Sequence, residues 1–170
     1  MHRKAVIVLR IIAVAWLLAS NAALADPPKP KEAVAAVAKL YRDYAWEAVV
    51  EEPNFDDAGL LEQSESVLAR YFDKQMVSLI LRDKRCALAH GSCRLDFDPI
   101  WNSQDPMAKE LKVLPTDDPA TVSVQFVYAG DNTPIKLTYR LIQTGGGWKI
   151  TDIIGTYGSL RGILESNFQP

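Results

Sequence analysis

The sequence is poor in the residues that most often carry chemistry, with two cysteines and two histidines among its 170 residues. His2 falls in an N-terminal segment that we expect to be removed, which leaves His90 alone. A Ser-His-Asp or Cys-His relay would depend on that one histidine, for which a turn position between the two cysteines is the simpler role. The sequence also lacks a glycine-rich phosphate loop after a strand, because the glycines at 145–147 are typical of a hairpin turn.

Long apolar runs are equally scarce, and the one present lies at the N-terminus. Basic residues at 3 and 4 precede an apolar run at 11–18, and Ala23-Leu24-Ala25 follows it, a pattern typical of a cleaved secretory signal peptide. The run is too short to span a bilayer, which needs about 20 apolar residues. No cysteine follows it that could carry a lipid anchor. We therefore expect a periplasmic or secreted bacterial protein, cleaved near Ala25 and without a stable membrane anchor.

Excess positive charge is also missing. Removing residues 1–25 takes away Arg3, Lys4 and Arg10 and no acid, which leaves 16 basic and 21 acidic residues and a net charge of −5. Such a balance does not favour nucleic acid as a partner. Residues 26–31 hold three prolines and predict an extended linker, and residues 32–170 suit one domain with a proper core.

The two cysteines, Cys86 and Cys93, are close in sequence. In the oxidising compartment that a signal peptide implies, they are expected to form a disulfide. Their spacing matches neither a thioredoxin-type redox pair nor a zinc knuckle. We therefore predict a structural disulfide, with no metal and no cofactor.

The first half of the chain has helical periodicity. Apolar residues at helical spacing predict a helix from Glu32 to about Val50, with Glu47 on its polar side. An acidic, turn-rich loop at 51–59 follows, and helical spacing resumes from 61 to 72. Asp73 is a candidate N-cap for a further helix, which we expect to end between Cys86 and Gly91 with the glycine as a left-handed cap.

The second half of the chain alternates as strands do. Residues 122–128, 135–142 and 148–154 predict three antiparallel strands joined by turns at 130–132 and 145–147, whereas 109–115 is of uncertain type. Ser159 is a candidate cap for a short final helix. The expected fold class is α+β, with N-terminal helices packed on a curved, cone-like antiparallel sheet.

Residues 95–105, which we call the hinge segment, separate the helical half from the strands and concentrate polar and aromatic side chains. Asp96, Asp98 and Asp105 suggest three readings: turn and cap residues, a binding surface, or ligands of a hard cation helped by the amides at 102 and 104. The spacing lacks the glycine and terminal glutamate of a calcium loop. The hinge segment is therefore our first candidate for a functional site.

Together with the Gly146-Gly147-Trp148-Lys149-Ile150-Thr151-Asp152-Ile153 strand and the Gly158-Ser159-Leu160-Arg161 motif, the hinge segment resembles a bacterial envelope family, domain of unknown function 3828. This family is similar to the nuclear transport factor 2-like, or cystatin-like cone, fold. The resemblance covers about residues 34–164. It implies an envelope location and a cone fold, and it implies no activity and no catalytic residues.

Three functions follow as hypotheses. The first is a non-enzymatic module that binds an envelope protein or a small ligand through the open cone. A narrower version is an inhibitor or immunity protein against an envelope-acting toxin. The third is a carboxylate-dependent hydrolase or isomerase using Asp98, Asp105 and Asp152, which requires at least two of these aspartates to face a common cavity. A set of aromatic residues is expected either to line the open cone or to belong to the hydrophobic core: Trp46, Trp101, Tyr139, Trp148 and Tyr157. For the binding module the predicted site residues are Asp98, Trp101, Gln104, Asp105 and Asp152.

Overall fold

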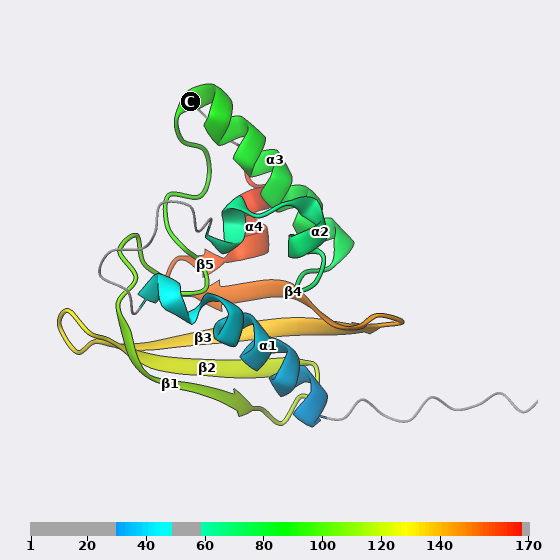
Figure 1. Cartoon of the computed structure of the whole chain (residues 1–170), viewed down its shortest axis with the longest axis vertical. Coiled ribbons are helices and arrows are strands. Elements are labelled where there is room, and N and C mark those ends of the chain that lie inside the picture. Colours follow the sequence, from blue (N-terminus) through cyan, green and yellow to red (C-terminus); the bar gives the residue numbers. More distant parts are fainter. Residues whose placement is uncertain (1–29, 49–58, 168–170) are drawn as a thin grey trace, which may run out of the picture.

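The computed structural model describes residues 30–48 and 59–167, which form helices followed by one antiparallel sheet. The predicted signal peptide, most of the linker and nearly all of the acidic loop lie outside the described residues. The sheet has the order β1-β2-β3-β4-β5, and α1 lies across one of its faces while α3 and α4 pack toward its β4–β5 side (Figure 1). The predicted α+β class is confirmed. Among the described helices, none is long and apolar enough to cross a bilayer.

Caps fix the start of two of the described helices. They are α1 (Pro30–Tyr44), η1 (Ala45–Ala48), η2 (Leu60–Glu62), α2 (Glu65–Leu68), α3 (Lys74–His90) and α4 (Leu160–Glu165). Asp73 caps α3 by accepting a hydrogen bond from the Met76 N–H at 2.8 Å. Gly91 ends α3 with a φ of 83°, and Ser159 accepts the Gly162 N–H at 3.0 Å to start α4. The three predicted caps are confirmed.

The end of the first helix differs from the prediction in a way that matters for the site. The α-helix stops at Tyr44 and continues as the 3₁₀ turn η1, instead of running to about Val50. Residues three apart are eclipsed in 3₁₀ geometry, so Glu47 follows the inward direction of the buried Tyr44. The prediction that Glu47 lies on the polar side is therefore wrong. The predicted helix over 61–72 is likewise broken into η2 and α2.

The strands are β1 (Ala108–Pro115), β2 (Thr121–Tyr128), β3 (Pro134–Thr144), β4 (Gly147–Gly155) and β5 (Gly158–Ser159). The predicted three-strand meander is confirmed as β2-β3-β4, and the segment of uncertain type is the edge strand β1. One face of the sheet buries Val124, Leu137 and Tyr139 under α1. Just before α3, Phe72 bridges Ile150 of β4, which ties the helical half to the sheet.

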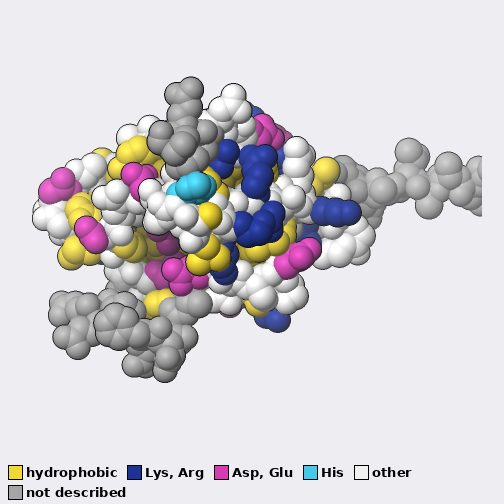
Figure 2. All heavy atoms as spheres, turned by 90° about the horizontal axis from the view of Figure 1, so that it is seen from above, with side chains coloured by type: hydrophobic (Ala, Val, Ile, Leu, Met, Phe, Trp, Pro, Cys, Tyr) yellow, Lys and Arg dark blue, Asp and Glu magenta, His cyan; other side chains and the backbone are white. Residues whose placement is uncertain are grey.

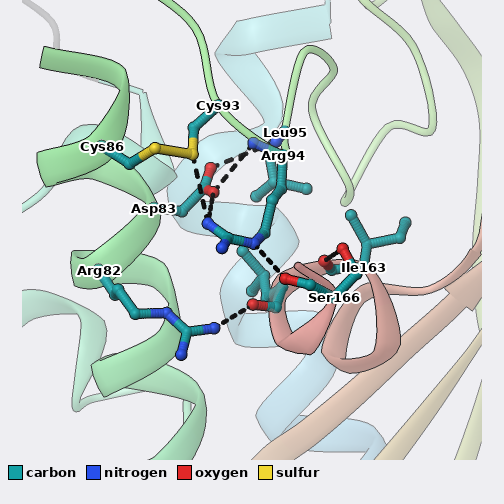
Figure 3. Close-up of a disulfide and its surroundings, with 9 residues drawn as sticks. Arg82, Asp83, Cys86, Cys93, Arg94, Leu95, Ile163 and Ser166 are labelled. Atoms are coloured by element: carbon teal, nitrogen blue, oxygen red, sulfur yellow. Dashed lines mark hydrogen bonds and ion pairs between the residues drawn. A yellow bond between two sulfur atoms is a disulfide. The ribbon is translucent and has the colours of Figure 1, made fainter. Parts of the chain in front are cut away.

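The disulfide predicted between Cys86 and Cys93 is present, with the two Cα atoms 5.7 Å apart. It joins the last turns of α3 to the chain that enters the hinge segment (Figure 3). One helical turn earlier, the buried Asp83 carboxylate accepts the N–H groups of Arg94 and Leu95 at 3.0 and 3.2 Å and pairs with the Arg94 guanidinium at 3.5 Å. The entrance of the hinge segment is therefore held to α3 by a covalent bond and a buried carboxylate.

Replacing both cysteines by serine is expected to lower the free energy of unfolding by about 2–3 kcal/mol, because the cross-link closes a short loop in the unfolded chain. Urea unfolding of residues 26–170 measures this loss. The wild-type domain, unfolded in the presence of a thiol reductant, is the matched control and should show the same loss. A change below about 0.5 kcal/mol would contradict the stabilising role.

Candidate functional site

The structure separates the five predicted site residues. Asp98 and Trp101 turn toward the interior, whereas the side chains of Gln104 and Asp105 are exposed at the far end of the hinge segment. Asp152 is buried on β4 and has partners of its own. Among the described residues, the hinge segment and Asp152 therefore do not form one shared pocket.

The hinge segment closes on itself and aims two large side chains inward. The Asp98 N–H donates to the Ser103 carbonyl at 2.8 Å, and the Ser103 N–H returns a bond to the Asp98 carbonyl at 3.3 Å. Asn102 takes a left-handed φ of 54° within this turn, a conformation that asparagine tolerates. Its side chain accepts the Thr156 N–H at 3.0 Å. The turn buries both Ile100 and Trp101 in the core.

Inside this turn, Asp98 meets Glu47 from η1, a residue that the sequence did not single out. Glu47 Oε1 accepts the Leu60 N–H at 2.8 Å, and Glu47 Oε2 accepts the Trp101 indole N–H at 3.0 Å. Asp98 Oδ1 accepts the Ile100 N–H at 2.9 Å. The two carboxyl groups are also hydrogen-bonded to each other. The carboxyl pair of Glu47 and Asp98 thus joins η1, η2 and the hinge segment.

Burial and mutual repulsion disfavour the charged form of this carboxyl pair. Burial, and next the negative charge of Glu47, raise the pKa of Asp98 to about 7. Burial also raises the pKa of Glu47. Two carboxylates cannot bond directly unless one of them carries a proton, so the pair shares a proton on the acidic side of neutrality.

Aromatic side chains fill the space beside the carboxyl pair. The Tyr41 hydroxyl donates to the Ile100 carbonyl at 2.7 Å, which leaves the Tyr139 hydroxyl to donate to Tyr41 at 2.8 Å. Trp101 packs edge-on against Tyr41 and Phe126, with ring centroids 5.1 and 5.6 Å away. Burial raises the pKa of both Tyr41 and Tyr139. Near the carboxyl pair, the space that an open cone would leave is therefore packed.

The aromatic residues predicted as cone lining or core fall mostly in the core. Trp101, Tyr139 and Trp148 are buried, and Trp46 is half-buried on η1. Tyr157 is exposed and stacks on Phe97, with ring centroids 4.5 Å apart.

Asp152 has a complete set of structural partners. Its Oδ1 accepts the N–H groups of Ile153 and Arg161 at 2.9 and 3.0 Å, and both carboxylate oxygens lie within hydrogen-bond distance of the Ser159 hydroxyl. The Arg161 guanidinium in turn donates to the Thr151 carbonyl at 2.8 Å. Asp152 therefore fixes the β4–β5 turn and the start of α4.

The described residues also form surface grooves, and one of them runs beside α3. Its volume is about 580 Å³, and we call it the α3 groove; it is lined by Leu61, Glu62, Ile80, Asp83, Lys84, Ala87, Leu88, Gly91 and Leu95. Two others, of about 550 and 440 Å³, lie between α3 and β4 and over β1–β3. None of these three grooves is lined by any of the five predicted site residues. In the part of the chain that the structure describes, no three acidic, histidine or cysteine side chains gather as metal ligands.

Sequence reasoning missed Glu47 and Leu88. The one signal for Glu47 was its position among aromatic residues at the end of a helix, where a change in helical period redirects a side chain. Leu88 lies one turn before the Gly91 cap, and its 81% exposure is the largest of any large apolar side chain among the described residues. The sequence does not show that exposure.

Comparisons with known proteins assign no class to this fold and site. No family model matches the chain, and no curated protein matches it. Among solved structures, the chain is similar to a protein of unknown function from Bacteroides thetaiotaomicron VPI-5482. The identity is 21%, the match covers 73% of this chain and 89% of the other, and the TM-score is 0.43.

Proposed function

We propose that this protein is an exported, non-enzymatic binding module that holds a protein partner in the α3 groove. The observation that carries this proposal is Leu88, which is 81% exposed at the rim of an apolar groove. Exposing a leucine beside other apolar surface has a cost in water, and interfaces are where such surface is used. A groove of about 580 Å³ that opens to solvent suits an apolar side chain of another protein.

The groove has rigid walls, which favours binding. One wall is α3, and the opposite wall carries Leu61 on η2 and Leu95 at the start of the hinge segment. Beside it, the disulfide and the Asp83–Arg94 pair fix the hinge entrance to α3 (Figure 3). A pre-organised groove loses less conformational entropy when a partner docks.

The charge around α3 defines the partner's chemistry. The helix carries four cations, of which Lys84 lines the α3 groove, and the ion pairs among the described residues involve none of the four. Lys74 and Arg85 line the groove between α3 and β4, and Arg82 donates to the Leu164 carbonyl. Its one acid, Asp83, is paired with Arg94. Figure 2 shows Lys and Arg side chains gathered next to hydrophobic ones, with acidic side chains mostly around them. In a chain with more acidic than basic residues, this surface fits a partner that presents an apolar anchor flanked by carboxylates.

The geometry gives less support to a carboxylate-dependent enzyme. Asp105 is exposed and Asp152 caps α4, so the three predicted aspartates do not meet at a common cavity among the described residues. The carboxyl pair of Glu47 and Asp98 has the raised pKa of a general acid, yet it packs beside Trp101 and lines none of the three grooves.

The export and family parts of the proposal rest on other observations. The disulfide is consistent with an oxidising compartment, and the N-terminal pattern of residues 1–25 is that of a signal peptide. The packing of helices on one side of a curved antiparallel sheet supports membership of the envelope family that the sequence resembles. We propose a periplasmic location on these grounds.

Photo-crosslinking tests the binding function. With p-benzoylphenylalanine at Ala87, inside the α3 groove, irradiation of the source cells is expected to yield one discrete adduct with another envelope protein. Adding Leu88→Asp should reduce the adduct at least tenfold, because it places a charge where the anchor docks. Raising the salt of an extract from about 0.05 to about 0.5 M should also reduce it if the flanking contacts are ionic.

Two matched variants control this experiment. Ile142→Asp alters another exposed apolar residue, on β3, and should leave the adduct unchanged, and the crosslinker at the exposed Tyr157 should give no such adduct. Loss of the adduct in Ile142→Asp, no adduct at Ala87, or an adduct only with a second copy of the chain would contradict the proposal. The mass of the captured protein shows whether it is an envelope-acting toxin.

A further inference from the structure

A second groove runs along α3, between this helix and β4, and we call it the α3–β4 groove. Its volume is about 550 Å³, and no residue lines both this groove and the α3 groove. Lys74, Ser78, Leu81 and Arg85 line it at helical spacing, so they form one stripe along α3. The opposite wall comes from α2 and from the hairpin of β3 and β4, which lie beside the first turns of α3 (Figure 1).

Three cations line the α3–β4 groove: Lys74 and Arg85 from α3, and Lys149 from β4. The ion pairs among the described residues involve none of the three. A cation without a carboxylate partner at the wall of a groove attracts a ligand that supplies one.

Two acids also line the groove, and they do not cancel this charge. Asp73 caps α3 and lies 3.5 Å from the Arg161 guanidinium, so its carboxylate already has partners. Glu65, in the first turn of α2, is the other acid. Three cations therefore face one carboxylate that has no cation of its own among the described residues.

Lys149 is positioned in advance for an anion. Its Nζ donates to the carbonyl oxygens of Ala69 and Arg70 at 2.6 and 2.9 Å. An ammonium group has three donors, so one donor is left for a further acceptor. Because the Asp73 N–H donates to the Ile150 carbonyl at 3.0 Å, Lys149 lies near the Lys74 end of α3.

The positive charge lies at the two ends of an apolar strip. Arg85 follows Lys74 by eleven residues, which is roughly 16 Å along a helix that rises 1.5 Å per residue. Val77 and Leu81 lie between them on α3, and Phe72 lines the groove as well. A phosphate ion reaches only one end of this strip, and a fatty acid would place its tail beside the second cation. The strip therefore matches an elongated ligand with an anionic group at each end.

We propose that the α3–β4 groove is a second binding site, which takes an extended acidic peptide segment of another protein. An extended chain rises about 3.3 Å per residue, so two carboxylates about five positions apart reach both ends of the strip. One carboxylate binds Lys74 and Lys149, the other binds Arg85, and an apolar side chain between them packs on Val77 and Leu81. This site does not depend on the α3 groove, because the two grooves share no residue.

Nuclear magnetic resonance with a synthetic peptide tests this site. The whole chain, exported and labelled with nitrogen-15, is titrated with Glu-Ser-Leu-Val-Ser-Glu, blocked at both ends. The backbone amides of Ser78, Leu81 and Thr144 are expected to shift along one saturating curve, whereas the amide of Leu88 in the α3 groove should not. Moving the two glutamates to separations of two to eight positions should give the tightest binding at four to six. Replacing both glutamates of the peptide by glutamine should weaken binding at least tenfold.

Matched variants identify the cations that act. Lys74→Gln and Arg85→Gln are each expected to weaken binding about threefold, as the loss of an exposed ion pair does. Lys84→Gln makes the same change of charge on the next residue along the helix, which lines the α3 groove, and should leave the affinity unchanged. Ser78→Glu places a negative charge at an exposed position in the middle of the strip and should abolish binding. Gln75→Glu, exposed on the same helix but lining none of the three grooves, should not.

Several results would overturn this inference. They are an affinity that does not depend on the separation of the glutamates, a loss in Lys84→Gln as large as in Arg85→Gln, and shifts at Leu88 in place of Ser78. Dodecanoate or inorganic phosphate that binds the same amides more tightly than the peptide would also overturn it, because the groove would then be a site for a lipid or a small anion. None of these results affects the adduct at Ala87 that tests the proposed function, and loss of that adduct leaves the peptide titration unchanged.

Discussion

Replacing Trp101 by alanine is expected to lower the free energy of unfolding by about 3–5 kcal/mol, enough to unfold much of a domain of ordinary stability. The side chain is 2% exposed and packs edge-on against Tyr41 and Phe126, so its removal opens a large cavity between α1 and the sheet. It also removes the indole donor to Glu47, which leaves a buried carboxylate oxygen with one partner fewer. Urea unfolding at pH 6 measures the loss.

Two further variants separate packing from hydrogen bonding at this position. Trp101→Phe keeps much of the aromatic side chain but loses the indole donor, so we expect it to lower the free energy of unfolding by about 1–3 kcal/mol. Trp46→Ala removes a half-buried tryptophan on the adjacent 3₁₀ turn and should cost clearly less than Trp101→Ala. If Trp46→Ala proves as damaging as Trp101→Ala, the hinge segment is not the centre of packing that the structure indicates.

Much of the fold was predictable because its signals are local. Asp73, Gly91 and Ser159 act through bonds within one turn of their own helices, so sequence position alone identifies them as caps. The β2-β3-β4 meander follows from two-residue alternation and turn residues, and the disulfide follows from the cysteine count. These features need no knowledge of what packs against them.

The features that sequence reasoning missed depend on partners far along the chain. Glu47 has polar neighbours in the helical pattern, and its inward direction comes from the change to 3₁₀ geometry at Ala45. Its partners, Leu60 and Trp101, are 13 and 54 residues away. The helical spacing that continues to Phe72 similarly gives way after α2 ends at Leu68, where Phe72 bridges Ile150, a tertiary contact that overrides helical periodicity.

Only part of the candidate site was predictable from the sequence, for the same reason. The density of polar and aromatic residues identified the hinge segment, and two of its members, Asp98 and Trp101, do meet there. Gln104 and Asp105 have the same residue types but lie beyond the closing Asp98–Ser103 bridge, so they point to solvent. Composition located the segment, and only the closed turn decides which side of it faces the core.

The stability of the folded domain is expected to fall as the pH rises from about 4 to about 7. The pKa of Asp98 is raised from 3.8 to about 7 by burial and by Glu47, so between these values the native state binds a proton that the unfolded chain has released. The stability that such a group contributes is fully present below its pKa in the unfolded chain. It is lost as the pH rises through its pKa in the folded domain. About three units at roughly 1.4 kcal/mol each give a loss of up to roughly 4 kcal/mol.

Other carboxylates act in a different pH window. The pKa values of Asp43, Asp118 and Asp131 are lowered, so the stability that these residues contribute is lost only as the pH falls below about 4. Glu47, with its raised pKa, adds to the loss on the alkaline side. The most stable pH should therefore lie near 4–5, which is more acidic than the usual optimum for a protein of this kind.

Urea unfolding of wild type and Asp98→Asn at several pH values between 4.5 and 8.5 separates this effect from the rest of the titration. The asparagine variant has no proton to lose at position 98, and its Glu47 keeps three donors, so its stability should change by less than a third of the wild-type change. Because the variant keeps the hydrogen bond that the wild type loses, the two curves should cross near neutrality, with Asp98→Asn the more stable form at pH 8. Parallel curves would mean that the pH dependence arises elsewhere, and a wild-type optimum near pH 7 would mean that the two carboxyl groups do not share a proton.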